Sequence, residues 1–70
     1  MNFDYSALRA EILFQYGTVL NFSKEIGISS VALYNKLANK RSFTTEEIVK
    51  IMDKLKLPKN TISDFFFTVV

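Results

Sequence analysis

The sequence predicts an all-α fold, a single compact domain over residues 1–70 built from five short helices. Apolar residues recur at helical spacing along most of the chain, as in the segment that holds Ile48, Ile51, Met52 and Leu55. The two glycines and the single proline stand at the boundaries of these periodic segments and not inside them. With 49% hydrophobic residues, the chain has enough apolar side chains for one small core.

The first helix is expected from about Tyr5 to Tyr16. Asp4 precedes it as an N-cap, because its carboxylate can accept a hydrogen bond from the free amides of the first turn. Gly17 follows it, and glycine readily adopts the left-handed conformation that ends a helix. The residues expected to point inward are Leu8, Ile12 and Leu13.

Residues 18–38 are predicted to form two short helices joined by a tight turn, which is the layout of a helix-turn-helix. The first helix of the pair spans Val19 to Ile26 and ends at Gly27. The second starts near Ser30, with Ser29 as its N-cap, and runs to about Ala38. Ser23 is small enough to let the two helices approach closely. The second helix of such a pair can enter the major groove of DNA.

After this motif, Asn39 is expected to adopt a left-handed conformation at the helix end, and Phe43 to fold back onto the core. Thr44 and Glu47 have the spacing of a capping box, in which each side chain bonds to the backbone amide of the other residue. This pattern predicts the start of a fourth helix that ends near Lys56 and carries the apolar stripe named above.

The fifth predicted helix runs from about Pro58 to Phe66, with Ile62 and Phe66 inward. Residues 65–70 form an apolar tail in which three consecutive phenylalanines would point in three directions on a helix, while the two valines favour strands. This tail predicts contact with a second copy or another partner through Phe65, Phe67, Val69 and Val70. The alternative is that two phenylalanines fill the core and the rest of the tail frays.

The composition excludes several classes of function. The chain has no cysteine and no histidine, so it can form neither a disulfide nor a Cys/His metal site. It also lacks a glycine-rich phosphate loop and a nucleophile beside a base, so we expect no enzyme activity, no cofactor, no metal and no small-molecule substrate. No apolar run is long enough for a membrane span, and the first residues lack the order of a signal peptide. We therefore expect a soluble, cytoplasmic protein.

The basic residues are unevenly distributed, although the net charge is only +2. Lys36, Lys40 and Arg41 cluster around the end of the second motif helix, and no acidic residue lies between Glu25 and Glu46. Such a cluster predicts contacts with phosphate groups. The alternative is that these cations only face solvent, since cations are also favourable at a helix C-terminus.

The residues of the motif resemble those of the lambda-repressor/Cro-type (XRE-like) helix-turn-helix family. That family usually has Gln, Ala and Gly at the positions of Val19, Ser23 and Gly27, so Val19 departs from the pattern. The stretch LYNKLANKRSFTTEEI looks like the small phage Cro-like regulators, with their L-x-x-K-L-x-x-K…F-x-x-x-E-I pattern. The resemblance covers nearly all of the chain and implies a lambda-repressor-like DNA-binding domain.

The resemblance also implies which residues would contact operator DNA. Base edges would be read by Ser30, Val31 and Asn35, because Asn can bond adenine, Ser several bases, and Val the thymine methyl group. Phosphates would be held by Ser29, Tyr34, Lys36, Lys40 and Arg41. Tyr34 has the alternative of covering the edge of the core.

A second function is compatible with the same residues. Val19, Leu20, Val31 and Tyr34 are apolar or aromatic at positions that a DNA-facing surface would often make polar. This pattern resembles the small modulator-of-repression proteins of temperate phages, which share the fold but bind the DNA-reading domain of the phage repressor. The alternative is that Val19 and Leu20 are buried against the first helix, which leaves an ordinary Cro-like surface.

Two hypotheses therefore follow for a phage-type regulator of a lysis–lysogeny switch in the cytoplasm of a bacterial host. In the first, the protein is a Cro-like repressor that binds double-stranded operator DNA in the major groove, as a homodimer joined by its tail. In the second, it is a modulator or antirepressor that binds the cognate phage repressor through the same helical face.

Overall fold

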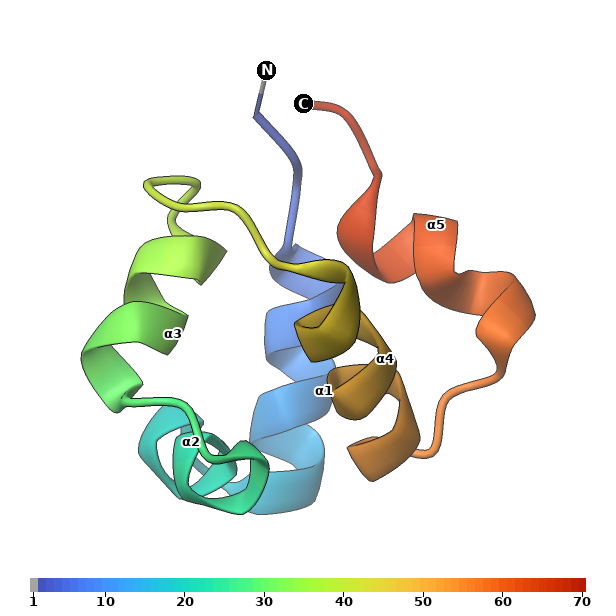
Figure 1. Cartoon of the computed structure of the whole chain (residues 1–70). Helices are drawn as coiled ribbons and strands as arrows, with labels where there is room; N and C mark the ends of the chain where they lie inside the picture. Colours follow the sequence, from blue (N-terminus) through green and yellow to red (C-terminus); the bar gives the residue numbers. More distant parts are fainter. Residues whose placement is uncertain (1) are drawn as a thin grey trace.

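The computed structural model describes residues 2–70 as five α-helices and one short 3-10 helix (Figure 1). The elements are α1 (Ser6–Tyr16), α2 (Val19–Ile26), α3 (Ser30–Leu37), α4 (Thr45–Lys54), η1 (Lys59–Thr61) and α5 (Ile62–Phe66). No strand longer than an isolated bridge occurs among these residues. The all-α prediction with five helices is confirmed, but the first turn of the expected fifth helix is the 3-10 helix η1.

One core holds these helices together. Its largest fully buried side chains are Phe22 of α2 and Phe66 of α5, which together with aliphatic residues of α1, α3 and α4 fill the interior. Phe43 lies in the loop between α3 and α4 and packs edge-on against the rings of Tyr5 and Phe66, at centroid distances of 5.3 and 5.2 Å. The predicted return of Phe43 to the core is therefore confirmed.

Helix α1 starts at Ser6, one residue later than predicted. Asp4 Oδ1 accepts a hydrogen bond from the Ser6 amide at 2.9 Å, so Asp4 supports the first turn although Tyr5 is the residue directly before the helix. The inward position predicted for Leu13 is wrong, because its side chain is 44% exposed. At 100° per residue, Leu8 and Ile12 share one face of the helix, and Leu13 is rotated away from both.

Helix α4 begins with the predicted capping box. The Thr44 amide donates to Glu47 Oε1 at 2.8 Å, and the Glu47 amide donates to Thr44 Oγ1 at 3.1 Å. The helix ends two residues earlier than predicted, at Lys54, and Lys56 follows with a φ of 57°. The apolar stripe of α4 faces the core as predicted: Ile51, Met52 and Leu55 are buried and Ile48 is half-buried.

The two ends of the chain lie side by side (Figure 1). Residues 2–4 and 68–70 run antiparallel, with Phe3 opposite Val69. The Asp4 amide donates to the Thr68 carbonyl at 2.7 Å, and the Val70 amide donates to the Asn2 carbonyl at 3.2 Å. The alternative of a frayed tail is therefore wrong after Phe66, since the tail is paired with the first residues of the chain.

The candidate interaction face on α2 and α3

Helices α2 and α3 are joined by a three-residue turn and are steeply inclined to each other, as in a helix-turn-helix (Figure 1). The Thr18 hydroxyl caps α2 by accepting from the Asn21 amide at 3.0 Å. Gly27 ends α2 with a φ of 72°, a left-handed conformation that glycine adopts without strain. Ser23 is buried between the helices, and its hydroxyl donates to the Leu20 carbonyl at 2.6 Å. Both predictions for this turn are confirmed.

Three large apolar or aromatic side chains are exposed on these two helices. We call Leu20, Val31 and Tyr34 the α2–α3 face. Val31 is 68% exposed, because it lies in the first turn of α3 on nearly the opposite side of the helix from the core residue Leu33. Val31 and Tyr34 lie three residues apart and therefore on the same side of α3. A valine and a tyrosine thus occupy the side of α3 that points away from the core.

Val19 does not belong to this face. Its side chain is only 3% exposed, so its predicted role in partner contact is wrong. Val19, Phe22, Ser23 and Ile26 are spaced by three and four residues and form the buried stripe of α2. Because α2 packs this stripe against the core, only Leu20 of the two residues that begin α2 remains exposed.

Lys36, which the sequence predicts to contact phosphate, is buried. It is 5% exposed, and its Nζ pairs with Oε2 of Glu47 on α4. Burial raises the pKa of the Glu47 carboxyl. Hydrogen bonds from Lys36 and Thr44 and the positive charge of Lys36 lower this pKa, and together they outweigh burial, so the net pKa lies below its ordinary value. The structure therefore contradicts the prediction that Lys36 contacts phosphate.

The other predicted base-reading and phosphate residues differ in accessibility. Val31 is exposed, whereas Ser30 and Asn35 are half-buried. Ser29 is exposed, but its hydroxyl accepts a hydrogen bond from the Ala32 amide at 3.1 Å and so caps α3. The three candidates for base contact lie together in the first two turns of α3, on or beside the α2–α3 face.

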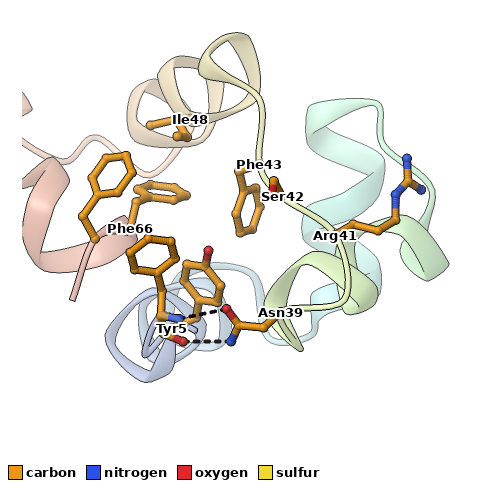
Figure 2. Close-up of a pocket in the computed structure, with 9 residues that line it drawn as sticks. Tyr5, Asn39, Arg41, Ser42, Phe43, Ile48 and Phe66 are labelled. Carbon is orange, nitrogen blue, oxygen red and sulfur yellow. Dashed lines mark hydrogen bonds between the residues drawn. The ribbon is translucent and has the colours of Figure 1, made fainter. Parts of the chain in front are cut away.

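Lys40 and Arg41 are exposed directly after α3. They follow Asn39, which has a φ of 64° and thereby confirms the predicted left-handed conformation. Figure 2 shows that the Arg41 side chain extends away from the aromatic residues of the loop and the core. These two cations, unlike Lys36, can reach a ligand from solvent.

A small pocket lies behind the same loop. It has a volume of about 240 Å³ and is lined mainly by aromatic rings, among them those of Phe43 and Phe66 (Figure 2). Burial raises the pKa of the Tyr5 phenol above its ordinary value of 10.0, so ionisation of this hydroxyl is even less favourable than in a free tyrosine. Among residues 2–70, no group of three or more acidic side chains is placed to hold a metal ion. No helix in this part of the chain is long and apolar enough to cross a membrane.

The fold and the exposed face define a small helical domain of the helix-turn-helix type. The chain belongs to the family described as "Protein of unknown function (DUF739)", whose model matches residues 1–69. It is also similar to the solution structure of the modulator of repression (MOR) of the temperate bacteriophage TP901-1 from Lactococcus lactis. The two share 34% sequence identity and superpose with a TM-score of 0.83, over 96% of this chain and 90% of that chain. No curated protein matches the sequence.

These comparisons support a small phage regulator. They do not single out the Cro-type or XRE-like family, which the residues of the motif resemble. Val19, the residue that departs from the pattern of that family, is buried in the core side of α2.

Proposed function

We propose that this protein is a modulator of repression, which binds a phage repressor through the α2–α3 face. The observation that carries the proposal is the exposure of Val31 and Tyr34 on the outer side of α3. The similarity to the TP901-1 modulator of repression supports it. The modulator-of-repression proteins that this chain resembles bind the DNA-reading domain of the phage repressor. On this proposal, the bound repressor loses its contact with the operator.

The chemistry of the face favours a protein over DNA. Apolar side chains gain free energy by leaving water against another apolar surface, and aromatic anchors dominate many protein interfaces. They gain little from a phosphate backbone, which is held by cations and hydrogen-bond donors. On this protein the ion pair with Glu47 removes Lys36 from that set of cations.

Binding of the purified protein to the repressor of the same phage tests the proposal. Val31→Asp places a charge in the centre of the interface, and we expect it to weaken binding by about 2 kcal/mol or more, roughly thirtyfold. Val49→Asp is the matched control, because Val49 is an exposed helical valine on α4 (56% exposed against 68% for Val31). Wild-type affinity of the Val31→Asp variant would refute the proposed face.

Operator binding is the second candidate, and the exposure of Lys40 and Arg41 beyond α3 favours it. Counterion release would make DNA binding strongly salt-dependent, whereas burial of an apolar face would be less sensitive to salt. A gel-shift assay on the adjacent intergenic DNA at two salt concentrations, with and without the repressor, separates the candidates. A salt-sensitive shift by the protein alone would favour operator binding, and loss of the repressor's own shift would favour modulation.

A further inference from the structure

The paired chain ends have two outer edges: the backbone groups of one edge are hydrogen-bonded, and those of the other edge are not. We call residues 2–4 and 68–70 the terminal ladder. Phe3 and Val69 lie opposite each other, but the hydrogen bonds are made by their neighbours, from Asp4 to Thr68 and from Val70 to Asn2. In this type of antiparallel pair, the backbone N–H and C=O of the two opposed residues point outward, to opposite edges of the ladder.

Asn39 closes the edge at Phe3. The Phe3 amide donates to Asn39 Oδ1 at 2.9 Å, and Asn39 Nδ2 donates to the Phe3 carbonyl at 2.8 Å. Figure 2 shows both bonds as dashed lines between the loop after α3 and the first residues of the chain. The side-chain amide of Asn39 thus takes the place that a neighbouring strand would have.

The edge at Val69 is open. Within residues 2–70, no hydrogen bond reaches the Val69 amide or its carbonyl, and the Val69 side chain is 60% exposed. Phe67 and Val70 beside it are also exposed. Proteins usually protect such an edge with a charged residue or a proline, but residues 65–70 contain neither.

We propose that the Val69 edge pairs with the same edge of a second copy of this chain, with Val69 opposite Val69 of the partner copy. A two-fold axis at this residue lets each chain donate its Val69 N–H and accept at its Val69 C=O, which makes two hydrogen bonds from one residue of each chain. The apolar side chains of the tail gather around the axis, and residues 65–70 carry no charged side chain that opposes their approach.

A second copy fits this edge better than a peptide from another protein. Each terminal ladder has a single open edge, because Asn39 closes the other one. Two ladders joined by their open edges therefore leave no free edge, so the assembly ends at a dimer and does not grow into a fibre. A foreign peptide would instead leave its own outer edge unpaired.

This inference is independent of the proposed function, because the terminal ladder and α2 lie at opposite ends of the molecule (Figure 1). The Val69 edge points away from Asn39 and the end of α3, so pairing of the tails would keep both α2–α3 faces accessible. The dimer would then present two binding faces to a repressor or to two half-sites of DNA.

Sedimentation equilibrium of the full chain up to about 1 mM tests the proposal, since weak self-association lies in this range. We expect a monomer–dimer equilibrium that Val69→Lys weakens about tenfold, because the two lysines would be placed directly opposite each other. The matched control is Val49→Lys, which adds the same charge at a similarly exposed valine on α4 and should leave the equilibrium unchanged.

Amide exchange of the wild-type protein gives a second measurement that needs no variant. We expect the Val69 amide to become protected as the concentration rises, while the Phe3 amide is protected at all concentrations. A monomer throughout the concentration range would overturn the proposal. So would a dimer whose Val69 amide stays unprotected, or one that Val69→Lys and Val49→Lys affect equally.

Discussion

Lys36 of α3, which is buried, forms an ion pair with the half-buried Glu47 of α4, and the same carboxylate closes the capping box of α4. Glu47 Oε2 accepts from Lys36 while Oε1 accepts from the Thr44 amide. One side chain therefore connects the end of α3 to the beginning of α4. Lys40 and Arg41 lie in the loop between these two helices.

Replacement of Lys36 should reveal this structural role. We expect Lys36→Met to lower the free energy of unfolding by about 1–3 kcal/mol, because the half-buried Glu47 carboxylate loses its charged partner. Urea denaturation measures the change. Lys40→Met is the control, since Lys40 is exposed and its replacement should stay within about 0.5 kcal/mol of wild type. Equal stability of the two variants would mean that the ion pair contributes nothing.

The stability of the protein should depend on pH through the same carboxylate. The folded state holds the pKa of Glu47 below its ordinary value of 4.5, so the ionised form is favoured by folding. This contribution is fully present above pH 4.5 and is lost as the pH falls through the lower, folded-state pKa. Urea denaturation between pH 7 and pH 3 should therefore show a decline in the free energy of unfolding that begins near pH 4.5.

Glu47→Gln isolates the contribution of this residue. In that variant the free energy of unfolding should decline less with falling pH. The remaining decline should occur at lower pH, where Asp4 titrates. The hydrogen bonds from the Ser6 side chain and backbone hold the pKa of Asp4 below its ordinary value of 3.8. An unchanged pH profile in Glu47→Gln would assign the acid sensitivity to other groups.

Asn39 offers a test of how strongly the loop after α3 holds the first residues of the chain. Asn39→Gly retains the left-handed backbone but removes both hydrogen bonds to Phe3, so we expect a loss of about 1–2 kcal/mol in stability. Asn39→Asp keeps an acceptor for the Phe3 amide and should restore protection of that amide from exchange. If Phe3 exchanges at the same rate in all three proteins, the side-chain amide does not hold it.

Much of the fold follows from local signals in the sequence. The capping box at Thr44 and Glu47, the turn at Gly27 and the left-handed Asn39 each depend on residues within one helical turn, and the structure has all three. Local geometry places such residues in the same way in many folds. The antiparallel pairing of the chain ends joins residues more than sixty positions apart, and no local pattern contains that information.

The candidate site was harder to predict, because accessibility depends on tertiary packing. Leu33 and Leu37 lie one helical turn apart, a spacing that places them on the same side of α3, and both are buried in the core. A lysine beside them normally lies in solvent, and the burial of Lys36 follows only from the position of Glu47 on another helix. Val19 was ambiguous for the same reason, since the packing of α2 against α1 decides whether its first turn is covered.

Lys56 provides a prediction of increased stability. It is one of two residues other than glycine with a positive φ among residues 2–70, and its value of 57° lies in the left-handed region that costs an L-residue about 1–2 kcal/mol. Its backbone continues the end of α4, where its amide donates to the Asp53 carbonyl at 3.1 Å and the next amide, of Leu57, donates to Met52 at 3.0 Å. Glycine fits this position of a helix end without strain.

We therefore expect Lys56→Gly to stabilise the protein by about 0.5–1 kcal/mol, after the entropy that glycine loses on folding is subtracted. For a domain of this size, the increase corresponds to a rise in Tm of about 2–8 °C, which differential scanning calorimetry resolves. Asp53→Gly is the control within the same turn: it places glycine in the last turn of α4 and should lower Tm. A lower Tm for Lys56→Gly as well would show that the lysine side chain contributes more than its backbone conformation costs.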